Sequence, residues 1–127
     1  MPVQFKMVPK QNNISTPPQI KYYPCAVSKG TIDLEQVADI ISSRSSLTPG
    51  DCYGVLISMS AVIGEALAEG KIVKIDSLGT FALTLTGTGA DSPEPLGKSH
   101  IKMAKIVYKP SKRLKKILST LTFKRIY

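Results

Sequence analysis

Lysine and arginine side chains are concentrated in the last third of the chain. From Pro95 to Tyr127 there are ten basic residues and no acidic one, in a sequence with 17 Lys and Arg against 9 Asp and Glu. Cationic groups at this density neutralise phosphates, so a polyanion is the expected partner. A solvated surface that keeps the protein soluble is the alternative that charge alone leaves open.

The candidate phosphate-binding residues form two groups. One is spaced along a strand-like stretch, and the other covers one face of a short terminal helix. Lys outnumbers Arg, and compact ammonium groups bind phosphate without reading the base sequence. This favours non-specific or shape-selective binding over base readout. The candidates are Lys98, Lys102, Lys105, Lys109, Lys112, Arg113, Lys115 and Lys116.

Residues for catalysis do not form a plausible set. The sequence has one histidine, His100, no paired acids at useful spacing, and no Gly-Lys-Ser or Gly-Lys-Thr loop for a phosphate. Cys25 and Cys52 are isolated and lie outside any CxxC spacing, which favours reduced thiols over a disulfide or metal pair. We therefore expect a binding module and not an enzyme, with no cofactor, metal or small-molecule substrate.

The first group of lysines requires a long hairpin. Thr80 to Thr86 alternates apolar and polar residues, as a one-sided antiparallel strand does, and Ser99 to Lys109 is its return strand. Between them, Gly87 to Gly97 is too rich in Gly and Pro for a regular element and forms the tip. The alternation in the return strand changes phase near Ala104, which predicts a β-bulge there.

Two helices precede the hairpin. Ile32 to Ser43 is amphipathic, and a second helix is expected from Pro49 to Glu69, with Thr48 as its N-cap and Gly70 as its C-terminal cap. The stretch from Tyr53 to Gly64 within it has no charged residue. A helix that is apolar on nearly all sides needs cover on nearly all sides, which indicates a partner subunit. Burial inside a larger monomeric core is the alternative.

The two ends of the chain predict further strands. Val3 to Met7 alternates as a half-buried strand does, and a second strand covers Ile20 to Val27, where Pro24 requires an edge position or a break. Pro110 ends the return strand, and a short third helix follows it. Phe123 to Tyr127 is a candidate last strand, with the N-terminal strand as a possible neighbour.

Membrane-spanning and secretion signals are not expected in this sequence. No apolar stretch is expected to reach the roughly 18 to 20 residues of a membrane span, and Met1 to Lys10 lacks the apolar core of a signal peptide. The expected location is the cytoplasm, without membrane contact.

Two motifs in the expected order carry a resemblance to a known family. Ile75 to Phe81 (IDSLGTF) is similar to a hydrophobic-x-Gly-Phe-Gly-Thr-Phe signature, and Tyr108 to Lys112 (YKPSK) resembles Phe-Lys-Pro-Gly-Lys. These are motifs of the HU and integration host factor family of bacterial histone-like proteins, which the chain resembles from about Thr31 to Leu121. Ser77 and Leu78 depart from the usual Gly and Phe. The N-terminal strands resemble those of longer HU-like variants from Bacteroides relatives.

The resemblance implies an α+β fold with a helical base, an antiparallel sheet, a long β-hairpin arm over about 82–109 and extra N-terminal strands. It divides the chain into an N-terminal β extension, 1–30, packed on the same domain as an HU-like part, 31–127. It further implies an intertwined homodimer that binds, bends or compacts double-stranded DNA in the nucleoid. The implied dimer core consists of Leu56, Met59, Ile63, Leu67 and Phe81.

The arm tip is where family and local chemistry differ. A tip proline can wedge between base steps, and Pro93 or Pro95 matches that place, although both also suit a plain turn. The family's arms are typically basic, whereas Ala82 to Gly97 contains no Lys or Arg. A rival function therefore remains, an HU-fold structural or protein-interaction module with weak or lost DNA binding. Binding of RNA or another polyanion is a further alternative.

Overall fold

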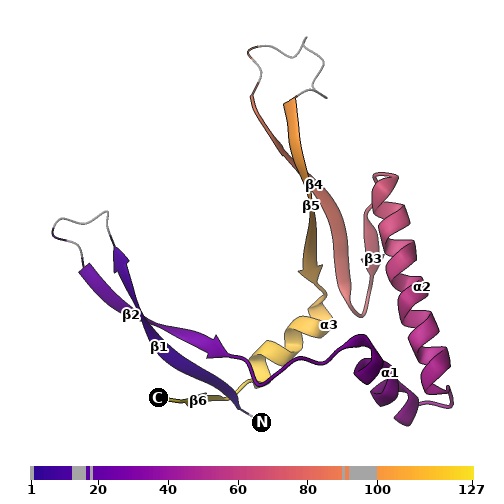
Figure 1. Ribbon diagram of the computed structural model, residues 1–127, viewed down its shortest axis with the longest axis horizontal. Helices are drawn as coiled ribbons and strands as arrows, with labels where there is room; N and C mark the ends of the chain where they lie inside the picture. Colours follow the sequence, from indigo (N-terminus) through magenta and orange to yellow (C-terminus); the bar gives the residue numbers. More distant parts are fainter. Residues whose placement is uncertain (1, 13–16, 18, 90, 92–99) are drawn as a thin grey trace. The chain divides into compact units, whose positions relative to one another are not determined.

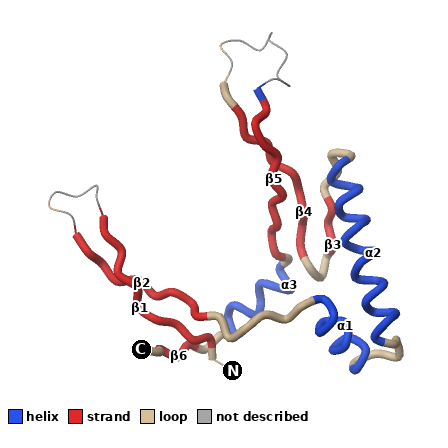
Figure 2. Tube along the Cα trace, viewed as in Figure 1, coloured by secondary structure: helices blue, strands red, loops and turns tan. Residues whose placement is uncertain are grey.

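The computed structural model describes residues 2–12, 17, 19–89, 91 and 100–127, which belong to two compact units (Figure 1). One unit comprises Met1–Asp33 and Ile117–Tyr127, and the other is Leu34–Lys116. Helices and antiparallel sheets together give the expected α+β class (Figure 2). The C-terminal segment, Ile117–Tyr127, belongs to the same unit as the N-terminal strands. A division of the chain at residue 30 would separate these two segments.

The first unit is a three-stranded sheet. It has the order β2-β1-β6, made of β1 (Val3–Asn12), β2 (Gln19–Val27) and β6 (Phe123–Arg125). β1 and β2 are antiparallel, and β6 runs parallel to β1 with Val3 opposite Phe123. The expected pairing of the last strand with the first is therefore confirmed. Pro24 lies in β2 at the edge of this sheet, where its missing N–H removes no ladder hydrogen bond on the open side.

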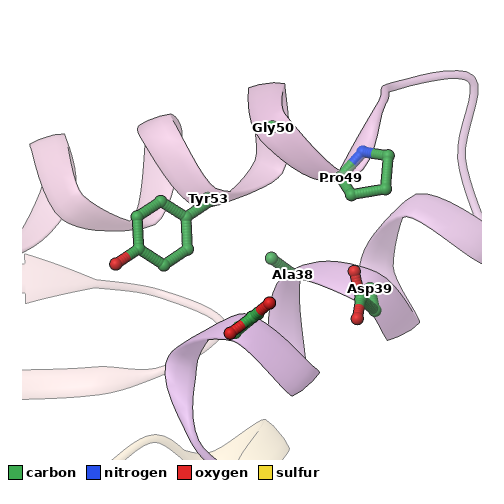
Figure 3. Close-up of a pocket in the computed structure, with 6 residues that line it drawn as sticks. Ala38, Asp39, Pro49, Gly50 and Tyr53 are labelled. Atoms are coloured by element: carbon green, nitrogen blue, oxygen red, sulfur yellow. The ribbon is translucent and has the colours of Figure 1, made fainter.

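The second unit begins with helices α1 (Leu34–Ser43) and α2 (Pro49–Ala68). The Thr48 hydroxyl accepts a hydrogen bond from the Asp51 N–H at 3.1 Å, and Gly70 has a φ of +82°, so both predicted caps are confirmed. The helices pack through small side chains, Ala38 and Cys52, which are 1% and 3% exposed. Figure 3 shows Ala38 of α1 facing the start of α2, with Asp39 beside Pro49.

The surface of α2 is largely open in the single chain. Val55 and Val62 are each 60% exposed, and Ile57 is 45% exposed. By length and composition α2 could also cross a membrane, so the expectation that no stretch reaches span length is wrong. The uncharged run from Tyr53 to Gly64 is too short to span a membrane. The whole of α2 has 20 residues with Asp51 and Glu65 as its only charged residues, and it is long and apolar enough to span one. The core helix of a soluble protein has the same properties.

The second sheet forms the arm. It has the order β3-β4-β5, made of β3 (Val73–Ile75), β4 (Gly79–Gly87) and β5 (Ile101–Pro110), all antiparallel. Pairing is regular from Gly79 opposite Pro110 to Thr86 opposite Met103.

The β-bulge in the arm lies closer to the tip than the sequence indicated. Ala104 pairs regularly with Leu85, and the register shifts between Thr86 and Gly87, which faces Ile101. The irregularity predicted near Ala104 is therefore present, but two residues away, because Lys102 is the residue without a partner on β4. A Cβ at Gly87 would collide with the His100 carbonyl, so the glycine permits the close backbone approach at the shift.

Candidate nucleic-acid interface

The two sequence motifs meet at the base of the arm. The Leu78 carbonyl accepts hydrogen bonds from the Tyr108 hydroxyl at 2.7 Å and from the Ser111 N–H at 3.2 Å. Because the acceptor is a backbone group, Leu78 makes these bonds although it departs from the usual residue type. The turn between β3 and β4 is thereby tied to the end of β5.

Gly79 allows this junction to close. Its φ is +145°, and a Cβ there would collide with the Lys109 carbonyl. Next to it, the rings of Phe81 and Tyr108 lie with centroids 5.0 Å apart at an interplanar angle of 40°, a favourable tilted aromatic contact. The position of Lys109 and the residues after it is therefore fixed by the turn.

The basic helix starts directly at the junction. The Ser111 hydroxyl accepts a hydrogen bond from the Leu114 N–H at 3.1 Å, which caps α3 (Lys112–Lys115). The helix is shorter than expected, since it continues as the 3-10 helix η2 (Lys116–Thr120). The cap and the junction together set the backbone from which Lys112, Arg113 and Lys115 extend.

A basic hollow lies beside the junction. Its volume is about 710 Å³, and one carboxylate residue, Asp76, stands among four cationic ones. Lys74 of β3 is the cation that sequence reasoning missed, because its relation to α3 depends on the folding of β3 onto β4. Its place as the one charged residue of a short apolar strand was the available signal. The lining consists of Lys74, Ile75, Asp76, Gly79, Thr80, Ser111, Lys112, Arg113 and Lys116.

Sequence comparison assigns the family. The family model described as "HU domain fused to wHTH, Ig, or Glycine-rich motif" matches residues 1–125, which is nearly the whole chain. The chain belongs to the HU-HIG family. The match includes the N-terminal strands, so these strands are part of the family's pattern in this chain. A comparison with curated proteins finds no match.

Two solved structures share the HU-HIG chain's fold. One is a putative bacterial DNA-binding protein from Bacteroides vulgatus, with a TM-score of 0.71 and 14% identity over 98% of this chain. This chain covers 48% of that protein, or about half its length. The other is Anabaena HU in a cocrystal with DNA, with a TM-score of 0.55 and 15% identity, covering 69% of this chain and 98% of that one. At these identities the likeness establishes the fold.

The lysines of β5 do not all share one face in this HU-HIG chain. Lys105 and Lys109 pair with Thr84 and Thr80, so they lie on the threonine face of the arm. Lys102 is at the register shift and has no regular partner on β4. The other face carries the apolar side chains, including Leu85 and Ile106, which are 61% and 65% exposed.

Three of the predicted site residues lie outside the described residues. They are Lys98 and the two candidate tip residues, Pro93 and Pro95.

The predicted dimer-core residues lie on the chain's own inner side. Leu67 is 2% exposed, and the other four are half-buried. They form the stripe of α2, with Phe81 from the sheet, that the chain itself partly covers. The more exposed apolar residues of α2 lie at other positions, Val55, Ile57 and Val62 among them.

A second hollow of this unit, between α1 and α2, has an acidic lining. Glu35 and Asp39 of α1 line a hollow of about 310 Å³ with Pro49, Gly50 and Tyr53 of α2 (Figure 3). Asp39 beside the N-terminus of α2 is a favourable placement, since carboxylates stabilise the positive end of a helix dipole. Among the described residues, no group of three His, Cys, Asp or Glu could hold a metal ion. The lining of this hollow is acidic, whereas the basic hollow contains Asp76 as its one carboxylate residue.

Proposed function

We propose that this protein is an architectural DNA-binding module that contacts the phosphates of duplex DNA without reading base sequence. The observation that carries the proposal is the group of cations around the β4–β5–α3 junction. Lys112 and Arg113 line the same hollow as Lys74, and Lys109 follows from the same fixed backbone. Membership of the HU-HIG family and the fold shared with DNA-bound Anabaena HU support this choice of ligand.

The proposed working form is a homodimer in the bacterial nucleoid. The exposed apolar residues of α2 and of the apolar arm face need cover that a second copy supplies. A subunit interface also accounts for the membrane-like length and composition of α2 without a membrane. The protein acts through binding, bending or compaction of DNA, and not as an enzyme.

The experiment is a binding titration with a labelled duplex at several salt concentrations. Log affinity falls by about 0.9 per log unit of salt for each neutralised phosphate, so on the order of six contacts give a slope near −5. Lys112→Glu with Lys115→Glu is expected to lower affinity on all sequences alike. The matched control, Lys29→Glu with Arg44→Glu, changes the charge equally at exposed residues that do not line the basic hollow.

Three results would count against the proposal. If the Lys112 and Lys115 variant binds as well as its control, the phosphate-binding surface is not at the junction. If the intact chain binds no duplex DNA but retains a protein partner, the arm belongs to a protein-interaction module instead. Stronger binding to RNA than to duplex DNA would redirect the proposal to another polyanion.

A further inference from the structure

The sheet of the first unit has two chemically different faces. Directly opposite residues in neighbouring strands place their side chains on the same face, and successive residues alternate. On one face lie Val3, Phe5 and Met7 of β1, which with Pro24, Ala26 and Phe123 line an apolar hollow of about 550 Å³. A one-sided sheet buries its apolar face and leaves its other face to water.

The other face carries lysines beside Val8, Tyr23, Cys25 and Val27, and we call it the N-terminal basic face. Its cations come from all three strands of the sheet and are all exposed. Residues 1–32 and 117–127 contain no Asp or Glu, so Asp33 is the one acidic residue in the sequence of this unit. The four cations make no salt bridge with a described carboxylate. They are Lys6, Lys10, Lys21 and Lys124.

One pair on this face works against folding. Lys10 and Lys21 are directly opposite in the β1–β2 register. Like charges in directly opposite positions destabilise a sheet. The nearest compensation is the ring of Tyr23, whose centroid lies 5.6 Å from the Lys10 Nζ. Such a pair is useful if a nucleic-acid backbone lies across it, because each ammonium group can then pair with its own phosphate.

The spacing of the face suits a nucleic-acid backbone. Lys6 and Lys10 are four residues apart on β1, which is about 13 Å at about 3.3 Å per residue. This length equals about four base-pair steps of duplex DNA at 3.4 Å each. The cations therefore repeat on the scale of several successive phosphates.

We propose that the N-terminal basic face binds the phosphate backbone of duplex DNA, as a second contact surface separate from the β4–β5–α3 junction. The proposal rests on the proposed function for its ligand. It gives the N-terminal strands a role of their own: they add phosphate contacts to those of the junction. Binding here is independent of base sequence, since the face offers lysines and no planar donor pair for a base edge.

The test uses one charge reversal in the full chain. Lys10→Glu removes the phosphate contact of Lys10. The new carboxylate also pairs with Lys21, so that Lys21 no longer contacts a phosphate. At 0.9 per contact, the salt slope for a labelled duplex should become shallower by about 1.8. If the two affinities converge at 1 M salt, the affinity of the variant is then about 60-fold lower at about 0.1 M. The same substitution replaces a repulsive pair by an attractive one, so the Tm should rise by about 2 °C. Weaker binding together with higher stability is a combination that a purely structural role would not produce.

The controls separate this inference from the proposed function. Lys29→Glu makes the same charge change just after β2 and is expected to bind nearly as the intact chain does. Lys21→Gln removes the opposed charge without creating a new pair, and should also weaken binding. If the intact chain binds duplex DNA and Lys10→Glu equals Lys29→Glu in affinity and slope, this inference is wrong and the proposed function stands. If the intact chain binds no duplex, both fail. A larger loss on single-stranded DNA or RNA than on duplex would overturn the choice of ligand.

Discussion

The hydroxyl of Tyr108 is the side-chain group that ties β5 to the turn before β4. Tyr108→Phe removes its hydrogen bond to the Leu78 carbonyl and keeps the ring contact with Phe81. The free energy of unfolding should fall by about 1 kcal/mol, because the Leu78 carbonyl keeps only the Ser111 N–H as its partner. Urea denaturation measures this loss. Tyr127→Phe, at a fully exposed ring, should change nothing, and equal effects from the two variants would contradict the role of the hydroxyl.

Gly79 is a more demanding position at the same junction. Gly79→Ala places a methyl group against the Lys109 carbonyl at a φ of +145°, so a loss of more than about 2 kcal/mol is expected. DNA affinity should fall as well, since Lys109 and α3 follow from this contact. Gly89→Ala, where a Cβ meets nothing within 4 Å, is the control. A Gly79 variant as stable as the Gly89 variant would show that the strands separate without cost.

Residues that act through their chain neighbours could be predicted from the sequence. The caps Thr48 and Gly70 depend on a few adjacent residues, and both hold. Lys74 and the pairing of Lys10 with Lys21 could not, since each depends on the register between two strands. Register depends on turn geometry and on which face is buried, and neither is visible in the spacing of lysines alone.

At the level of elements, the type of each segment was easier to predict than its irregularities. The hairpin and the two long helices follow from period and caps, and β6 beside β1 follows from two otherwise unpaired strands. The bulge was misplaced because the prediction put Met103 on the same face as Ile106, whereas Met103 pairs with Thr86 and lies on the threonine face. The glycine opposite Ile101 decides where the shift lies, and that pairing needs the register.

The arm tip allows a prediction about bending. If Pro93 or Pro95 wedges between base steps, unstacking costs a few kcal/mol, which contacts to the bent duplex must offset. Those contacts have to come from β5, because the sequence from Ala82 to Gly97 has no cation and contains Asp91 and Glu94. We expect modest bending of intact duplex and a preference for nicked or pre-bent DNA.

Energy transfer between dyes at the two ends of a short duplex measures this bending. Pro93→Ala and Pro95→Ala are compared singly and together with the intact chain, and the double variant should lose bending while keeping most of its affinity. Equal bending by the double variant and the intact chain would reduce the tip to a plain turn.

At the scale of the molecule, both units carry cations, but different structural elements bring these cations together. In the second unit the cations lie along β5 and α3, and the sequence pattern predicts both of these elements. In the first they are brought together by strands from both ends of the chain, β1, β2 and β6. The apolar residues show the complementary picture, because α2 and one arm face remain open in a single chain. A second copy covering the apolar surfaces would leave the cations to the ligand.

The homodimer is therefore the prediction on which the whole arrangement depends. Sedimentation or light scattering without detergent should give about twice the chain mass of 13.7 kDa. Val55→Glu with Val62→Glu should shift the protein toward monomer and lower its stability, because each places a carboxylate where apolar cover is needed and the desolvation of an unpaired charge is costly. Ile32→Glu, at a side chain of the first unit that is 63% exposed, is the control for adding a charge to an apolar position. A monomer at micromolar concentration, or a Val55 and Val62 variant that stays dimeric, would mean that α2 is covered by something other than a second copy of this chain.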